Sequence, residues 1–200
     1  MRLINNSIKN CIKSINIADV NMIICNIYNF DNDFEPFCYE INRILKNNGV
    51  LIILDEKCNK TEEEIKSLFP SLYKYKFQYQ NNFFRKTNNV YVFKKSIPII
   101  DIGYNEIPEN VIDNISDCVI RSGVIEYDND LPIDLVKFIY KKYTKEKDVV
   151  LDCNFGLGIS VRLAIENHLD FIGYEPDKEK YNIAINRLRT HKTRNLFKKG

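Results

Sequence analysis

The most informative stretch of this sequence is Val149-Val150-Leu151-Asp152-Cys153-Asn154-Phe155-Gly156-Leu157-Gly158. Its apolar beginning predicts a buried strand that ends at a carboxylate, and its two glycines allow the backbone to approach a ligand before a helix begins. A second expected strand, Phe171–Tyr174, is followed by the acidic residue Glu175. A Rossmann-like fold binds a nucleoside with this arrangement, because the acidic residue accepts hydrogen bonds from the ribose hydroxyls. A dinucleotide is not expected, since Val161 stands in place of the third fingerprint glycine.

Helix and strand signals alternate along most of the chain, which predicts an α/β fold with a mostly parallel sheet. From Tyr73 to Tyr79 aromatic and polar residues alternate with a period of two, which predicts a strand with one buried face. Val90–Phe93 is its expected antiparallel partner, in a hairpin at the edge of the sheet. The other expected strands are Arg2–Asn5, Val20–Cys25, Val50–Leu54, Val149–Asp152 and Phe171–Tyr174. The expected helices are Ile8–Ile15, Glu35 to a cap at Asn47–Gly49, Glu62–Phe69, Leu131–Tyr143, Gly158–Asn167 and one after Pro176.

Residues 96–129 show neither the period of a helix nor that of a strand. Acidic residues accumulate there against a single basic residue, Arg121, so we expect a linker or small insertion without regular structure. The expected organisation is a single domain over residues 1–200. Its halves, residues 1–95 and 130–200, are joined by the acidic segment 96–129.

The composition is that of an ordinary globular domain, with 200 residues of which 44% are hydrophobic and 28% charged. A net charge of +2 excludes a polybasic protein that wraps nucleic acid. No apolar run approaches the roughly 20 residues of a membrane span, and the N-terminus lacks a signal-peptide core, so no membrane partner is expected. Dispersed cysteines and only two histidines, without ligand spacing, predict no metal site and a location in the reducing cytoplasm.

Three motifs near the C-terminus resemble a known family. Leu151–Ser160 is similar to the Leu-Asp-Pro-Phe-x-Gly-Ser-Gly-Thr-Thr motif of the S-adenosylmethionine-dependent DNA amino-methyltransferases. Phe171–Asp177 resembles the family's Phe-Ile-Gly-x-Glu-x-Asp strand, and Leu131–Leu135 resembles its Lys-Pro-x-x-Leu helix with leucine in place of lysine. The resemblance implies S-adenosylmethionine as the cofactor, bound by Pro132, Asp152, Asn154, Phe155, Gly156, Gly158 and Glu175.

The N-terminal half resembles the same family in the order of its permuted members, in which the catalytic half comes first. Asp19–Tyr28 is similar to the strand Val-Asp-Leu-Ile-Ile-Thr-Asp-Pro-Pro-Tyr, and Glu40–Gly49 to Glu-x-x-Arg-Val-Leu-Lys-Pro-Gly-Gly. The likeness runs from about Ile4 to Leu188. It implies a Rossmann-like methyltransferase fold and methyl transfer to an exocyclic amine of adenine or cytosine in DNA.

The resemblance also implies three catalytic residues, Asn26, Ile27 and Tyr28. In the family's chemistry the first side chain and the next carbonyl accept the two amine hydrogens, and an aromatic ring stacks on the flipped base. The family's Asp-Pro-Pro-Tyr is reduced here to Asn-Ile-Tyr-Asn, so no proline fixes the carbonyl of Ile27, and Tyr28 or Phe30 has to supply the ring. A shift by one residue would put Cys25, a poor acceptor, in first place. Asn26 is alternatively an ordinary turn residue at the end of a strand.

Other departures leave alternatives open. Asn6-Ser7 replaces the family's Gly-Asp, which removes an acidic contact to the cofactor. The acidic segment 96–129 takes the place of the family's DNA-reading segment, so we expect the chain alone to bind DNA weakly, with a partner subunit or a homodimer left open. The alternative function is a catalytically inactive methyltransferase-like protein that binds cofactor, a partner subunit or both. Methylation of RNA or of a small molecule is a third interpretation.

Overall fold

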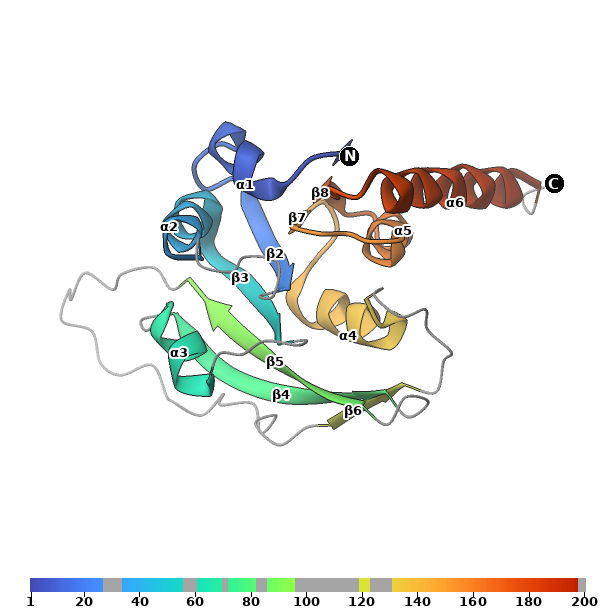
Figure 1. Ribbon diagram of the computed structural model, residues 1–200. Coiled ribbons are helices and arrows are strands. Elements are labelled where there is room, and N and C mark those ends of the chain that lie inside the picture. The colour runs from blue at the N-terminus through green and yellow to red at the C-terminus, as the bar shows by residue number, and fades with distance from the viewer. Residues whose placement is uncertain are drawn as a thin grey trace.

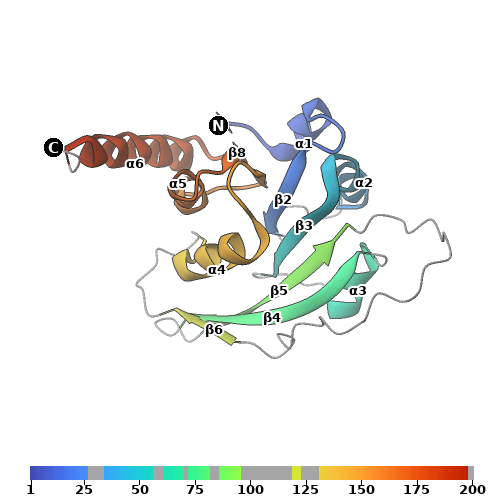
Figure 2. The same ribbon diagram turned by 180° about the vertical axis from the view of Figure 1, so that it is seen from behind.

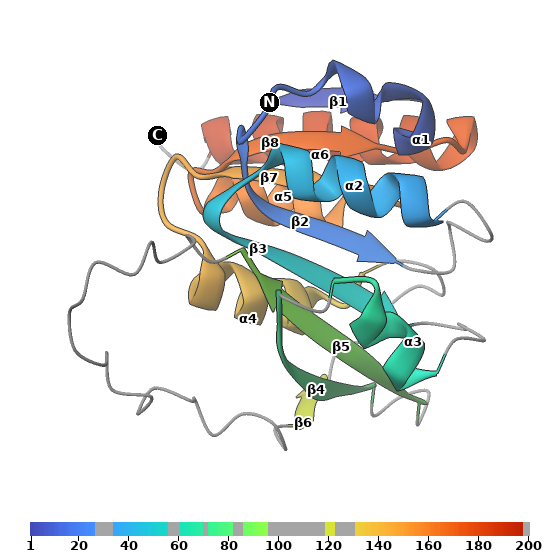
Figure 3. The same cartoon turned by 90° about the vertical axis from the view of Figure 1, so that its left-hand side faces the viewer.

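The computed structural model describes residues 1–26, 34–55, 61–69, 72–81, 86–95, 119–122 and 131–197. The strands in these ranges form one sheet in the order β1-β8-β7-β2-β3-β5-β4-β6, which Figure 3 shows from top to bottom. They are β1 (Arg2–Ile4), β2 (Val20–Asn26), β3 (Leu45–Asp55), β4 (Tyr73–Asn81), β5 (Lys86–Lys94), β6 (Val119–Ser122), β7 (Val149–Asp152) and β8 (Asp170–Tyr174). The helices are α1 (Ile8–Cys11), the 3₁₀ turn η1 (Ile12–Ser14), α2 (Phe34–Ile44), α3 (Glu62–Ser67), α4 (Ile133–Tyr143), α5 (Ile159–Glu166) and α6 (Lys178–Phe197).

The parallel part of the sheet joins the two halves of the chain. β1 pairs with β8, β8 with β7, β7 with β2 and β2 with β3, all in parallel. The first strand of the sequence therefore lies beside the last one, and β2 from the N-terminal half lies beside β7 from the C-terminal half. This arrangement confirms the predicted α/β fold with a mostly parallel sheet.

The antiparallel part of the sheet contains the predicted hairpin. β5 pairs antiparallel with both β3 and β4, and β6 then pairs in parallel with β4. The prediction that the hairpin lies at the edge is therefore wrong, because β6 covers its outer strand. The expectation that residues 96–129 contain no regular element is wrong for Val119–Ser122. Four residues are too few to show a period, so this strand is recognisable only by its pairing with β4.

Helices cover both faces of the sheet (Figure 1). The layer of α1, α2 and α3 packs on one face, and the layer of α4, α5 and α6 packs on the other. Successive side chains of a strand point to opposite faces, so each central strand serves both layers. In β2, Ile23 and Cys25 pack against the first layer, whereas Met22 and Ile24 pack against the second. This two-sided burial explains why β2 reads as a nearly continuous apolar run.

Helix α2 ends earlier than the sequence pattern predicts. The expected cap at Asn47–Gly49 is wrong, since α2 stops at Ile44 and Leu45 already pairs with β2. Lys95, just after β5, holds this helix end, because its Nζ donates to the carbonyl oxygens of Asn42 at 2.6 Å and Leu45 at 2.8 Å. Carbonyl groups in the last turn of a helix have no partner within the helix, so a side chain from another element stabilises the early end.

Helix α6 is the longest helix described, with 20 residues, and its C-terminal part extends beyond the sheet (Figures 1 and 2). Ala184 is buried on its inner side, and Tyr181 and Leu188 are partly buried against the same core. No helix within the described ranges is both long and apolar enough to cross a membrane.

Candidate functional site

Two carboxylates lie at the carboxyl edge of neighbouring strands. Asp152 is the last residue of β7, and Glu175 follows the last residue of β8; the strands are parallel, with Asp152 opposite Gly173. Asp152 is 2% exposed and Glu175 is 1% exposed. Open α/β sheets bind ligands at this edge, so the structure brings together two residues that were predicted from the sequence as parts of one site.

The glycine loop, residues 153–158, connects β7 to α5 and is held on both sides by backbone hydrogen bonds. The N–H of Cys153 donates to the carbonyl oxygen of Ile24 in β2 at 3.0 Å. The N–H of Phe155 donates to the carbonyl oxygen of Tyr174 in β8, also at 3.0 Å. The loop is therefore fixed to the strands on either side of β7.

Both glycines of the loop adopt left-handed backbone conformations. The φ angle is 55° at Gly156 and 93° at Gly158, in a region that favours glycine. Gly158 is the N-cap of α5, and a Cβ atom there would lie 3.1 Å from the Cβ of Ala184 in α6. Any other residue at Gly158 would thus be strained and would press on α6. The loop leads into a helix N-terminus, whose free N–H groups favour a negatively charged ligand group.

Phe155 anchors the glycine loop in the core. Its side chain is fully buried and lies against Gly173 of β8, where a Cβ atom would be only 2.6 Å from its Cδ1. Gly173 therefore makes room for the ring. No role was predicted for Gly173 from the sequence, although a glycine inside an apolar strand is the signal of such a close approach.

Glu175 holds the glycine loop with one carboxylate oxygen and the following turn with the other. Its Oε2 accepts from the N–H of Gly156 and its Oε1 from the N–H of Asp177, both at 2.9 Å. Burial raises the pKa of Glu175 above its usual value, and the two hydrogen bonds partly offset this rise. Asn5, which was not predicted to take part, donates from Nδ2 to the carbonyl oxygen of Glu175 at 2.8 Å.

Asn154 and Pro132 occupy different places in the site. The N–H of Asn154 donates to Oδ1 of Asp152 at 3.0 Å. The side-chain Oδ1 of Asn154 is buried and has no hydrogen-bond partner among the described residues. A buried acceptor in this state costs about 1–3 kcal/mol unless a ligand or water donates to it. Pro132 is buried at the N-cap of α4, outside the loop.

Strand β2 brings one of the three predicted catalytic residues to the same edge. Asn26 is the last residue of β2, two positions beyond Ile24, which lies opposite Asp152 of β7. The alternation of side chains places Asn26 on the sheet face of Ile24, which is the face that α4 covers. Ile27 and Tyr28 lie outside the described residues.

Cys25, the alternative first residue of the catalytic motif, lies in a different environment. Its side chain is buried in the core on the α1–α3 side of the sheet. Burial, with a smaller contribution from a hydrogen bond with Cys153, raises the pKa of the Cys25 thiol well above its usual value. A protonated thiol in the core is a poor acceptor for an amine hydrogen.

Comparison with known proteins finds relatives by sequence. Residues 105–186 match the DNA methylase family. Type II methyltransferase M.HindIII of Haemophilus influenzae is 40% identical over 68 residues, which are 34% of this chain and 22% of M.HindIII. The chain thus spans 22% of the length of the curated relative it matches.

Solved structures share the fold over nearly the whole chain. The S-adenosylmethionine complex of M1.HpyAVI superposes with a TM-score of 0.69 and 17% identity, covering 94% of this chain and 98% of that one. TTHA0409 of Thermus thermophilus, complexed with S-adenosylmethionine, gives 0.68 and 14%, covering 93% and 92%. The cytosine-N4-specific PvuII DNA methyltransferase gives 0.67 and 13%, covering 92% and 84%. Residues 105–186 therefore resemble the DNA methylase family in sequence, and nearly the whole chain shares the fold of these solved methyltransferase structures.

Proposed function

We propose that this protein transfers a methyl group from S-adenosylmethionine to an exocyclic amino group of adenine or cytosine in DNA. The observation that carries the proposal is that Asn26, Asp152 and Glu175 lie at the carboxyl ends of three neighbouring parallel strands, β2, β7 and β8, with the glycine loop beside them. These groups come from opposite halves of the chain, and the parallel pairing of β2 with β7 brings them together. The match of residues 105–186 to the DNA methylase family supports the choice of chemistry.

The residues of the site fit S-adenosylmethionine. Each carboxylate oxygen of Glu175 accepts from one backbone N–H and has a second lone pair, which would accept from a ribose hydroxyl. The buried Oδ1 of Asn154 is an acceptor to which a ligand can donate a hydrogen bond. Gly158 is the N-cap of α5, and the N-terminus of a helix favours a negatively charged group of a ligand. The bound cofactor would supply an electrophilic methyl group on its sulfonium. The residues proposed to hold it are Pro132, Asp152, Asn154, Phe155, Gly156, Gly158 and Glu175.

Asn26 is the proposed acceptor for the target amine. Its side-chain oxygen would accept one amine hydrogen, and the carbonyl of Ile27 would accept the other. Two such bonds orient the nitrogen lone pair towards the methyl donor, so that positioning lowers the barrier. Tyr28 would stack on the base once the base has left the helix stack. The position of Asn26 on the face of Asp152 supports this role.

DNA is the proposed macromolecular substrate, and the chain alone is proposed to bind it weakly. The acidic segment 96–129 has one basic residue, Arg121, and phosphate contacts require lysine or arginine. A partner subunit or a second copy of the chain would then supply the missing contacts.

Calorimetry with S-adenosylmethionine, followed by labelled-methyl transfer to DNA, RNA and free nucleosides, tests the proposal. Binding together with transfer to DNA amino groups would support it. Transfer to RNA or to free nucleosides, without transfer to DNA, would show that DNA is not the substrate. Cofactor binding without transfer to any of them would overturn the enzymatic proposal in favour of a cofactor-binding protein without catalysis.

A further inference from the structure

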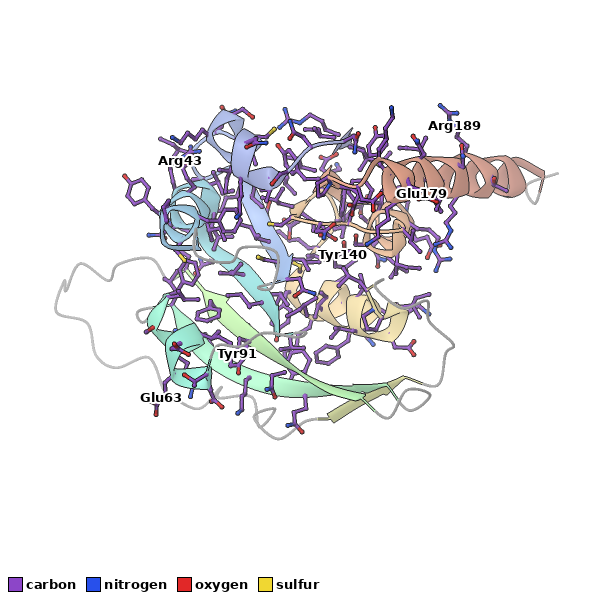
Figure 4. All side chains as sticks on the ribbon, in the orientation of Figure 1. Arg43, Glu63, Tyr91, Tyr140, Glu179 and Arg189 are labelled. Atoms are coloured by element: carbon purple, nitrogen blue, oxygen red, sulfur yellow. The ribbon has the colours of Figure 1, made fainter. Side chains whose placement is uncertain are left out.

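A cluster of buried polar side chains lies between α4, α5 and the end of β7. It consists of Tyr140 of α4, Ser160 of α5 and Asp152 of β7, which are 1%, 0% and 2% exposed. Figure 4 labels Tyr140, which lies between α4 and the strands. Burying a polar group costs free energy unless the group forms a hydrogen bond. The hydrogen-bond partners of these side chains therefore show which parts of the structure they connect.

The hydroxyl of Tyr140 connects α4 to the beginning of α5. Its Oη donates to the carbonyl oxygen of Ser160 at 3.1 Å within the buried cluster. Ser160 is the second residue of α5 and lies two positions after Gly158. Burial, and to a smaller extent the charge of Asp152, raises the pKa of Tyr140 well above its usual value. The hydroxyl therefore stays protonated and remains a donor at neutral pH.

Helix α4 is itself fixed to the antiparallel part of the sheet. The ring of Phe138 packs edge to face on Phe77 of β4, with centroids 5.4 Å apart. Leu135 and Ile139 are buried in the core on the same side of the sheet. The Tyr140 hydroxyl thus connects the first turn of α5 to α4, which is itself held in place by its packing on β4 and the core.

We propose that Tyr140 is a positioning residue for cofactor binding. Its bond to Ser160 fixes the first turn of α5, and with it the orientation of the N–H groups at the N-terminus of that helix, where the glycine loop ends. This inference rests on the proposed function, because the ligand that benefits is S-adenosylmethionine. Tyr140 acts through the loop, since its hydroxyl is buried and already bonded to Ser160.

The variant Tyr140→Phe tests the proposal, because it removes the hydroxyl and keeps the ring. Tyr91→Phe is the matched control: Tyr91 is equally buried, 1% exposed, but packs on the α1–α3 side of the sheet (Figure 4). Calorimetry is done well below the unfolding temperature of every variant. We expect the affinity of Tyr140→Phe for S-adenosylmethionine and for S-adenosylhomocysteine to fall by about three- to tenfold, and that of Tyr91→Phe to stay unchanged.

Hydrogen exchange of the cofactor-free proteins provides a readout that does not depend on binding. We expect Tyr140→Phe to speed the exchange of amides in residues 158–164 and to leave the rest of the sheet unchanged. Unaltered exchange there, or a uniform increase along the chain, would overturn the positioning role. Wild-type affinity in Tyr140→Phe would also overturn it, whereas a wild-type protein that binds no S-adenosylmethionine would instead refute the proposed function.

Discussion

Glu175 shows how a single carboxylate can organise the site. It is almost fully enclosed, yet it accepts a hydrogen bond from Gly156 on one side and from Asp177 on the other. Charge-assisted bonds of this kind are stronger than neutral ones, which offsets part of the cost of burying the charge. The residue therefore determines the shape of the glycine loop before any ligand arrives.

Replacement of Glu175 should weaken cofactor binding. We expect Glu175→Ala to reduce the affinity for S-adenosylmethionine by about 1.5–3 kcal/mol, because the proposed acceptor for the ribose and the anchor of the loop are lost together. Glu179→Ala is the control, since Glu179 is an exposed acidic residue in the first turn of α6. Calorimetry measures the affinity of both variants for S-adenosylmethionine. An unchanged affinity in Glu175→Ala would show that Glu175 does not bind the ribose.

The raised pKa of Glu175 predicts opposite pH trends for stability and for binding. Between 4.5 and the raised value, the folded protein binds more protons than the unfolded chain, so the contribution of Glu175 to the free energy of unfolding decreases as pH rises through this window. Cofactor affinity should instead be lost as pH falls through the raised value, because protonation removes an acceptor. Chemical denaturation and calorimetry of wild type and Glu175→Gln check both trends, and identical pH profiles for the two proteins would contradict them.

At the level of elements, the strongly periodic segments were predictable, whereas the end of α2 and the short strand β6 were not. β7 matches its predicted bounds of Val149–Asp152, since an apolar run followed by a carboxylate and glycine marks a buried strand. The end of α2 was missed because it depends on Lys95, which is distant in the sequence. β6 was missed because its four residues form a strand only through β4. Local patterns cannot report such tertiary contacts.

Lys95 should contribute measurably to the stability of α2. We expect Lys95→Met to lower the free energy of unfolding by about 1–2 kcal/mol, because two carbonyl oxygens at the helix end lose their donor. Lys94→Met is the matched control, since Lys94 is the exposed neighbouring residue at the end of β5. Urea denaturation measures the difference. Equal stability of the two variants would show that water replaces Lys95 without cost.

Across the whole molecule, the sheet explains how a chain with this motif order can form one site. β1 and β8 are neighbours, as are β2 and β7, so residues from opposite ends of the sequence reach the same edge. The strand-end carboxylates and the glycines were predictable because they lie at the end of an apolar strand or in the short loop after it. Gly173 carries a local signal, a glycine inside an apolar strand, but its partner Phe155 does not follow from it. Asn5 and Tyr140 were not predictable, since each acts through a residue remote in sequence.

The charge distribution of the chain predicts weak binding to DNA. We expect duplex DNA at physiological salt to bind the isolated protein weakly and without sequence preference, because the acidic segment 96–129 cannot release counterions from phosphates. Fluorescence anisotropy with duplexes of different sequence measures this. A sequence-specific footprint that disappears when residues 96–129 are deleted would show that the segment reads DNA.

The proposed catalytic role of Asn26 depends on its position at the end of β2, on the sheet face of Asp152. Labelled-methyl transfer by wild type and Asn26→Ala, with the cofactor affinity of both measured by calorimetry, tests it most directly. We predict that Asn26→Ala lowers turnover by on the order of 100-fold or more and leaves cofactor affinity nearly unchanged, the signature of lost positioning. Methyl transfer at the full rate by Asn26→Ala would refute the catalytic role of Asn26, and no transfer by the wild type to any nucleic acid despite firm cofactor binding would refute the proposed methyltransferase activity.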